Sequence, residues 1–545
     1  MTRAGRLTLI ATILGSTIVF LDATVVNVAL PAISDDLDTG LADQQWVVEA
    51  YLLALVSLLL VGGSLGDQFG RRRLFVLGLL GFAVTSALCA VAPGSELLIG
   101  ARAAQGLAGA LLVPGSLAIL AATFEGAERG KAVGTWTAWT GIATVIGPAG
   151  GGALIEALSW RAIFWVNVPL IVFTAMLALH AVDESSDPGA DRTIDWAGIV
   201  LSAAGLGGPV FALIQQPEHG WSDPMVYAPL IGGVLLFAVF LAWEARYRHS
   251  MLDLSLFRIR NFAVTNLETL IVYAGLIGAF FFVTIFLQQT IGYTALEAGL
   301  ATTPISILLF VLSPRFGRFA TSTGPRLPMA VGPIVGGVGL LLLTQVDAGS
   351  DYLTGVLPGI IVFGLGLSAT VAPLTATALD SVEERHVGIA SGINNGISRV
   401  AGLLAIAVLG AVIAGSFEST IDDRLGGATL SPKAQNAVAE AKDKPLGAAK
   451  TGGLSASEAA TVDAAVTSGS EQGFHLGMGL AGALMIVGGA IAGVGIRNPR
   501  RREDRIAPLA APAGECGRAQ EWRAPGPVPG TLDPEPAPTA PDPAY

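Results

Sequence analysis

The stretch "GGSLGDQFGRRRL", residues 62–74, lies between two apolar runs and carries most of the charge found near them. Its glycines at positions 63, 66 and 70 allow a tight turn and a close approach of the flanking helices. Asp67 can pair with Arg71, Arg72 or a neighbouring helix end, and arginines favour the cytoplasmic side of a membrane. The stretch therefore predicts a short charged connection between two membrane-spanning helices.

The composition of the whole chain agrees with a membrane protein. Of its 545 residues, 52% are hydrophobic and only 13% are charged, and the mean hydropathy is +0.63. The 69 glycines favour close packing of spanning helices. The two cysteines, Cys89 and Cys516, are too few for a disulfide framework or a usual cysteine metal site.

A bilayer core about 30 Å thick needs roughly 20 apolar residues per helix. The opening residues resemble a signal peptide, but the apolar run continues to Pro31 without a cleavage site, so we expect an uncleaved first helix. We predict about fourteen spanning helices near residues 7–31, 46–65, 74–92, 97–122, 134–157, 163–182, 195–215, 226–245, 263–288, 297–314, 327–346, 352–376, 388–415 and 473–496.

The short loops predict the orientation, because Lys and Arg stay on the cytoplasmic side. With the N-terminus inside, the outer short loops hold Arg161 alone, and the cytoplasmic ones hold Arg71, Arg72, Arg73, Arg129, Lys131, Arg192, Arg246, Arg248, Arg258, Arg260, Arg315, Arg318, Arg326 and Arg385. The last helix ends in "RNPRRR", so both termini are expected in the cytoplasm.

Two segments lie outside this helical array. Residues 416–472, rich in small residues and mixed charges, predict a long external loop with room for a short helical hairpin, most simply a passive cover. Residues 497–545 are rich in proline and predict a disordered cytoplasmic tail.

Asp22 lies near the middle of the first apolar run, where a carboxylate costs about 2.5–3.5 kcal/mol on insertion scales. Gly15 and Ala29 share its helical stripe, which favours a protein-facing position. At about 1.5 Å per residue, Arg102 in the fourth helix has a compatible depth and is its candidate partner. Pairing and burial act in opposite directions on the proton affinity of Asp22, so the pair predicts a switchable proton site. A permanent structural pair is the alternative.

Glu268 is a second carboxylate within an apolar run, near the cytoplasmic end of its helix. It predicts either a second proton or cation site or a side chain that reaches the membrane interface. Arg399 lies near a cytoplasmic helix end, where anchoring is the simpler interpretation.

Several motifs resemble those of one family. Gly63, Leu65, Asp67, Gly70, Arg71 and Arg72 match the G-x-L-x-D-x-x-G-R-R loop of the major facilitator superfamily. "RAAQGLAG", residues 102–109, resembles its fourth-helix pattern, and "IGPAGGGAL", with Gly147, Pro148, Gly151 and Gly152, resembles its antiporter helix motif. "LDATVVNVALP", which contains Thr24, Asn27 and Pro31, is similar to the first helix of fourteen-helix drug:proton antiporters of the EmrB and QacA type.

The resemblance implies an all-α polytopic membrane protein with the major facilitator fold. The expected parts are a six-helix bundle at residues 1–182, two inserted helices at 183–248, a second six-helix bundle at 249–496 with the external loop 416–472, and the tail. The loop around Asp67 would act as a conformational latch. Pro148 removes a helical hydrogen bond and loosens its helix, so Gly147–Gly152 would form a flexible seal; ordinary glycine packing is the alternative.

The implied function is proton-coupled export of lipophilic or cationic drugs by alternating access. A dedicated exporter of an endogenous metabolite, antibiotic or lipid would share every motif, and a non-transporting membrane sensor is a third interpretation. We expect no enzyme activity, because no nucleophile, base and orienting residue occur together. The chain has no phosphate-binding loop and no metal-binding motif, so we expect a proton gradient rather than a cofactor to drive it.

The expected partners are a small-molecule substrate, protons and the lipid bilayer, without nucleic acid, and the protein is expected to be a monomer. The expected location is the cytoplasmic membrane of a bacterium.

Overall fold

The computed structural model describes residues 1–186, 194–247, 252–383, 387–428, 430–442 and 444–498, all within one unit of the chain. Arg192, Arg248, Arg385 and nearly all of the predicted tail lie outside these ranges. The elements are α1 (Arg3–Leu37), α2 (Leu41–Phe69), α3 (Arg71–Ala90), α4 (Ser95–Thr123), α5 (Gly126–Ala157), α6 (Ala162–Trp165), α7 (Asn167–Ala181), α8 (Trp196–His219), α9 (Pro224–Glu244), η1 (Leu254–Arg258), α10 (Arg260–Gln289), α11 (Ala295–Thr323), α12 (Arg326–Leu343), η2 (Tyr352–Val356), α13 (Leu357–Asp380), α14 (Val387–Leu425), α15 (Pro432–Lys442) and α16 (Ala456–Gly495).

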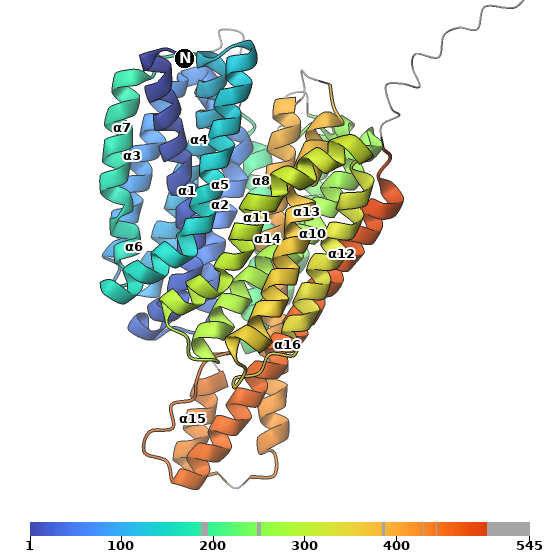
Figure 1. Cartoon of the computed structure of the whole chain (residues 1–545). Helices are drawn as coiled ribbons and strands as arrows, with labels where there is room; N and C mark the ends of the chain where they lie inside the picture. The colour runs from blue at the N-terminus through green and yellow to red at the C-terminus, as the bar shows by residue number, and fades with distance from the viewer. Residues whose placement is uncertain (187–193, 248–251, 384–386, 429, 443, 499–545) are drawn as a thin grey trace, which may run out of the picture. The chain divides into compact units, whose positions relative to one another are not determined.

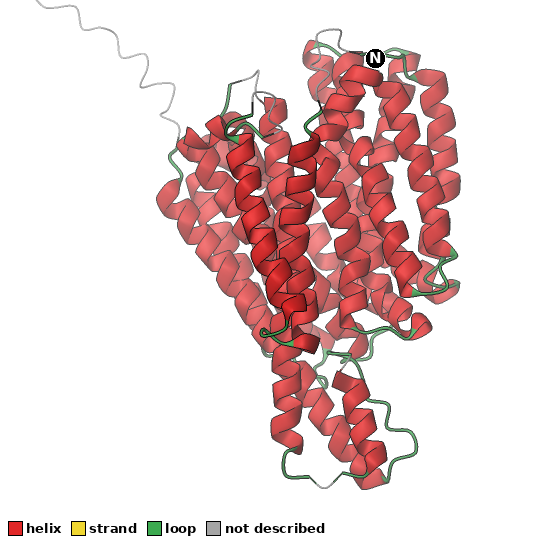
Figure 2. Ribbon diagram, turned by 180° about the vertical axis from the view of Figure 1, so that it is seen from behind, coloured by secondary structure: helices red, strands yellow, loops and turns green. Residues whose placement is uncertain are grey.

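The all-α prediction is confirmed: the described ranges contain helices, turns and loops but no strand (Figure 2). Within those ranges, twelve helical segments are long and apolar enough to span a membrane. Helices α2 and α5, with 29 and 32 residues, coincide with the other two predicted spans. The count of fourteen spanning helices remains a prediction.

Several helices are longer than their predicted apolar spans. Helix α1 continues past Pro31 to Leu37, so Pro31 lies inside the helix rather than at its end. Helix α14 runs on to Leu425, and α16 begins at Ala456. The segment predicted as a long loop, residues 416–472, is therefore largely helical.

These extensions pack with α15 into a small helical unit that projects from one end of the bundle (Figure 1). Its own apolar core explains why the chain stays helical there: Phe417 and Ile421 of α14 meet Ala434 of α15 and Val462 and Val466 of α16. We call this end of the molecule the α15 end. The N-terminus lies at the opposite end (Figures 1 and 2).

We call α1–α7 the first group of helices and α10–α14 with α16 the second group, and α8 and α9 form a pair beside them. The division into two six-helix bundles with two inserted helices stays a prediction. Helices α8 and α9 pack closely on each other, and α8 also contacts α2 and α14. Only 17% of the most apolar part of α9 is buried, against 61% for α10, so α9 is exposed on the outside of the bundle along most of this length. The most extensive contacts between the two groups are those of α5 with α11 and of α2 with α14, which we call the two seams.

Candidate functional site

Asp22 and Arg102 form an ion pair inside the first group of helices. Nη1 of Arg102 lies 2.5 Å from Oδ2 of Asp22, and each side chain is only 1% exposed. The sequence predicts compatible depths in the membrane for Asp22 and Arg102, and the structure shows the two side chains in contact. A buried charge pair of this kind is favourable only when further hydrogen bonds satisfy both partners.

Neighbouring helices supply those hydrogen bonds. Nε2 of Gln105 and Nδ2 of Asn167 donate to Oδ1 of Asp22, at 3.2 and 3.1 Å. Arg102 donates from Nη1 to Oε1 of Gln105 at 2.6 Å and from Nε to the carbonyl oxygen of Val47 at 3.1 Å. Its guanidinium lies 4.3 Å from the centre of the Tyr51 ring. Five helices of the first group therefore converge on the pair, because Ser86 of α3 also accepts a hydrogen bond from Gln105.

Sequence reasoning did not assign this supporting role to Gln105 and Asn167. Gln105 was visible as one helical turn from Arg102, since residues three apart share a face. Asn167 begins α7 and comes from a distant part of the chain, so only the tertiary fold reveals its contact with Asp22.

Two other carboxylates are buried without a partner. Glu268 is completely buried, and neither of its oxygens has a hydrogen-bond partner in the structure. The interpretation that Glu268 reaches the interface is therefore wrong for this conformation. Glu49 in α2 is also fully buried, and neither of its carboxylate oxygens has a hydrogen-bond partner among the described residues. We had not predicted a role for Glu49, although a lone carboxylate in the run "VVEAYLLALV" is a readable signal.

Arg399 is not simply an anchor at the membrane surface. Its guanidinium carbon lies 5.5 Å from the centre of the Phe20 ring in α1. The side chain therefore reaches across from the second group of helices to the first, on the same helix, α1, that carries Asp22.

The predicted antiporter helix motif forms two kinds of close contact. A Cβ atom at Gly147 or Gly151 would lie 2.3 Å from Oγ1 of Thr24 or 2.5 Å from Cγ1 of Val25, both in α1. A Cβ atom at Gly152 would lie 2.5 Å from the carbonyl oxygen of Ala295 in α11. The motif thus packs α5 against its own group on one face and against the other group on the next.

The seam between α5 and α11 is closed by this packing from both sides. Opposite Pro148, a Cβ atom at Gly299 would lie 2.4 Å from the Pro148 carbonyl oxygen. At these positions the two backbones touch, so no side chain fits between them.

The first-helix residues lie near the same contact. The Thr24 hydroxyl donates to the carbonyl oxygens of Phe20 and Leu21, and it also borders Gly147. Oδ1 of Asn27 is buried and has no partner. Pro31 is buried within α1.

The loop after α2 contacts the segment that follows α7. Gly70 has φ of 102°, which favours glycine, and a Cβ atom there would lie 2.6 Å from Oε1 of Glu184. The backbone N–H of Arg71 donates to Ser185, and that of Arg72 donates to Glu184 at 3.1 Å. Glu184 is thus an acidic partner of Arg72. Gly63 and Asp67 lie within α2, so the predicted loop is helical up to Phe69, and the side chain of Asp67 is not described.

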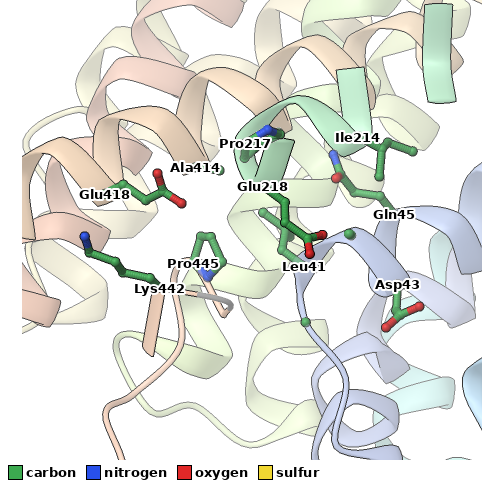
Figure 3. Close-up of a pocket in the computed structure, with 13 residues that line it drawn as sticks. Leu41, Asp43, Gln45, Ile214, Pro217, Glu218, Ala414, Glu418, Lys442 and Pro445 are labelled. Carbon is green, nitrogen blue, oxygen red and sulfur yellow. The ribbon is translucent and has the colours of Figure 1, made fainter. Parts of the chain in front are cut away.

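A pocket of about 280 Å³ lies at the α15 end, between α2, α8, α14 and the loop after α15 (Figure 3). Asp43, Glu218 and Glu418 line it together with Lys442, whose ammonium group pairs with Asp422 at 2.5 Å. Nε2 of Gln45, another lining residue, donates to the carbonyl oxygen of Ile406. The described ranges contain no group of three or more side chains suited to hold a metal ion.

Comparison with known proteins gives a consistent assignment. Residues 12–406 match the Major Facilitator Superfamily. The multidrug resistance protein Stp of Mycobacterium tuberculosis is 35% identical over 441 residues, which cover 81% of this chain and 82% of Stp. The tetracenomycin C resistance and export protein of Streptomyces glaucescens is 32% identical over 518 residues, 94% of this chain and 95% of that protein.

The fold agrees with this assignment. The crystal structure of a bacterial homologue of the human lysosomal transporter Spinster, in an inward-facing and unoccupied conformation, superposes with a TM-score of 0.63. That comparison covers 90% of this chain and 98% of the other at 14% identity. With the motifs, the helical architecture and these relatives in agreement, the chain belongs to the major facilitator superfamily.

Proposed function

We propose that this integral membrane protein exports lipophilic or cationic compounds across the bacterial cytoplasmic membrane in exchange for protons. The relatives named above are a multidrug resistance protein and a resistance and export protein, which supports the drug-export part of the proposal. Membership of a transporter superfamily agrees with the prediction that the chain is not an enzyme. The substrate is a small molecule, and the proton gradient replaces a cofactor.

The buried pair of Asp22 and Arg102 is the observation that carries the proton-coupling proposal. Three donors reach the Asp22 carboxyl group, from Arg102, Gln105 and Asn167. A change of helix packing that moves Arg102 away from Asp22 leaves a buried carboxylate that is favourable only with a proton. Rocking of the two groups of helices can in this way load and release one proton.

Glu268 and Glu49 are the second-line candidates for carrying a proton or a cation. An unpartnered carboxyl group in a low-dielectric interior is favourable in its neutral form. Because Glu268 belongs to the second group and Glu49 to α2, one carboxyl of this kind is available on each side of the seam between α2 and α14.

The two glycine motifs supply the mechanical parts of the proposal. Gly147, Pro148, Gly151 and Gly152 form the seal about which the groups rock. The junction of α2 and α3, with Gly63, Asp67, Gly70, Arg71 and Arg72, acts as a latch that is released and remade at the cytoplasmic surface, with Glu184 as a contact partner of Arg72.

The test is proton flux in liposomes that contain the purified protein and a trapped pH dye. A panel of lipophilic cations is added to the wild type and to Asp22→Asn, Glu268→Gln and Glu49→Gln under an imposed proton gradient. We expect Asp22→Asn to abolish substrate-driven proton flux. Removing one partner of a buried pair costs about 3–5 kcal/mol, so the double variant Asp22→Asn with Arg102→Gln is the control that restores neutrality.

The outcomes separate the proton sites. A double variant that is folded and binds substrate but moves no protons supports coupling through Asp22. Wild-type flux in Asp22→Asn would overturn that assignment, and loss of flux in Glu268→Gln or Glu49→Gln alone would move the site to that residue. A wild type without flux for any compound would contradict the proton-coupled function.

A dedicated exporter of one product is the second candidate. The similarity to the tetracenomycin C resistance and export protein extends over nearly the full length of both chains, which supports export of a single compound. A binding survey across dyes and polycyclic natural products separates the two: a broad profile supports multidrug export, and one tight ligand supports the dedicated exporter.

The orientation and assembly belong to the same proposal. The N-terminus and the C-terminal end of α16 lie at the same end of the bundle (Figure 1). We place that end in the cytoplasm because the predicted cytoplasmic loops are rich in Arg and Lys. We propose a monomer with lipid around α9. Labelling of single introduced cysteines in intact cells, with impermeant reagents, tests the orientation.

A further inference from the structure

A cavity of about 620 Å³ lies beside the seam between α2 and α14, under the peripheral pair α8 and α9. Its walls come from α2, α8, α9, α10, α14 and the segment before α10. The size falls within the range of small-molecule pockets, about 300–1,000 Å³. None of the residues described so far as a proton site lines it.

The described lining of the cavity is almost entirely apolar. Among the described residues, no Asp, Glu, Lys, Arg or His lines it. The polar side chains that do are bonded within the chain: Ser57 donates to Leu53, Ser202 donates to Ile199, and Asn266 donates to Phe262 and accepts from Asn394. An apolar group fits such a surface, and a polar group would lose its hydration without compensation.

The depth of the cavity matches the half of the membrane next to the N-terminal end. Its α10 wall lies between Ala263 and Leu270, within the first three turns of that helix. Its α9 wall lies between Val234 and Leu241, in the second half of a helix that ends at Glu244. With that end in the cytoplasm, the cavity lies at the level of the inner leaflet.

The cavity joins lipid to the interface between the two groups of helices. Val234 and Leu241 of α9 are 56% and 38% exposed, so this wall borders the lipid-facing surface. The opposite wall includes Val56 of α2 and Val400 of α14, the two helices of the seam. A molecule in the cavity would touch lipid on one side and the moving seam on the other.

We propose that this cavity binds the apolar tail of a lipophilic or amphipathic substrate taken up from the inner leaflet. Helices α8 and α9 form the outer wall of this entry site. The inference rests on the proposed export function and adds the substrate class and its route of entry.

The first experiment fills the cavity and compares two probes with the same charged headgroup. Gly396 in α14 lines the cavity, and a Cβ atom there would meet nothing within 4 Å, so Gly396→Trp fills the space without a backbone clash. Gly415→Trp is the matched control on the same helix, also in open space but outside the cavity. The probes are dodecyltrimethylammonium and tetramethylammonium.

We expect Gly396→Trp to raise the KM for dodecyltrimethylammonium transport about tenfold. This is the loss of affinity expected when about two methylene groups of the tail are no longer buried. The KM for tetramethylammonium and both values in Gly415→Trp stay unchanged. Equal KM values in Gly396→Trp and the wild type, or an equal rise for both probes, would overturn the proposal.

A binding readout keeps this test separate from the proposed function. Gly396→Cys, made in a chain with Cys89 and Cys516 replaced by alanine, is labelled with a maleimide in lipid nanodiscs. Protection by dodecyltrimethylammonium but not by tetramethylammonium supports the tail site even if no proton flux is found. Protection by phospholipid that the dodecyl probe does not displace identifies a structural lipid and overturns the proposal.

Discussion

The two seams both join the two groups of helices, but one is made by backbone contacts and the other by a side chain. Along α5 and α11 the backbones touch, because Gly152 lies against Ala295 and Gly299 lies against Pro148. Along α2 and α14 the contact is made by a side chain: Nε2 of Gln45 donates to the carbonyl oxygen of Ile406 at 2.8 Å. Further along that second seam the helices leave the cavity of about 620 Å³.

The difference explains where the peripheral helices pack. A backbone contact excludes lipid by itself, so the α5 and α11 seam needs no cover. The α2 and α14 seam borders the apolar cavity, and α8 contacts both of its helices. We therefore propose that the α5 and α11 seam acts as a seal and the α2 and α14 seam as a covered entry site. Each prediction below changes one of the two seams.

The largest effect is expected from a methyl group in the glycine seal. In Gly152→Ala or Gly299→Ala the new Cβ atom meets the carbonyl oxygen of Ala295 or Pro148, and only a backbone shift relieves the clash. Overpacking of this kind costs about 1–3 kcal/mol, which we expect to lower substrate-driven proton flux at least about tenfold. Liposome flux and the thermal midpoint of the purified variants measure the effect.

Gly150 provides the control within the same motif. A Cβ atom there would lie 3.6 Å from Cγ2 of Ile146 in its own helix, an ordinary contact. Gly150→Ala should transport like the wild type. Equal losses in Gly150→Ala and Gly152→Ala would mean that the motif acts through helix flexibility and not through the seam.

A smaller effect is expected at the side-chain contact of the second seam. Gln45→Ala removes one hydrogen bond, with a net value of about 0.5–1.5 kcal/mol. We expect the α15 end of this seam to open more often. A cysteine introduced at Ala414, which lines the pocket of about 280 Å³, should then react about threefold faster with an impermeant maleimide. The chain without Cys89 and Cys516 is the background.

Gly410→Ala tests the same contact from the opposite helix. A Cβ atom there would overlap Nε2 of Gln45, the flexible end of that side chain. It should displace Gln45 and reproduce the faster labelling, whereas Gly415→Ala, in open space on the same helix, should not. Unchanged labelling in both Gln45→Ala and Gly410→Ala would show that the hydrogen bond does not hold this seam closed.

The sequence predicts the class of fold and the central ion pair for physical reasons that are local. A run of about 20 apolar residues can only be a spanning helix, and a charge inside such a run needs a partner at its own depth, which led from Asp22 to Arg102. The glycine spacing of Gly147–Gly152 likewise indicated close packing. None of these steps needed the relative positions of distant helices.

The features that sequence reasoning missed depend on tertiary geometry. Asn167 contacts Asp22, although 145 positions of the chain separate the two residues. No sequence pattern in α7 predicts this contact. The helical unit at residues 416–472 is polar outside and stabilised by contacts of Phe417 and Val462 with α15, so its low hydrophobicity suggested a loop. The cavity under α8 has no motif at all, because it is a space between helices.

The smallest effect is expected where charges join the groups at the solvent-exposed α15 end. Nζ of Lys444 lies 2.6 Å from Oδ1 of Asp38, and Nζ of Lys450 lies 3.5 Å away. The hydrogen bond from Lys444, its charge and that of Lys450 hold the pKa of the Asp38 carboxyl below its ordinary value. Because the pKa is lowered in the folded protein, the contact contributes above the ordinary carboxyl pKa and is lost as the pH falls through the lowered value.

Lys444→Ala should therefore change the transport rate by about twofold or less, since Asp38 is 76% exposed and water and salt screen the pair. The change should be the same at pH 6 and pH 8, well above the titration of Asp38, and it should disappear at high ionic strength. The measurement is the transport rate of Lys444→Ala at low and high salt. Lys433→Ala, which changes an exposed lysine of α15 in the same helical unit, is the control. A loss as large as that of Gly152→Ala would mean that the charged contact, and not the glycine seam, holds the α15 end closed.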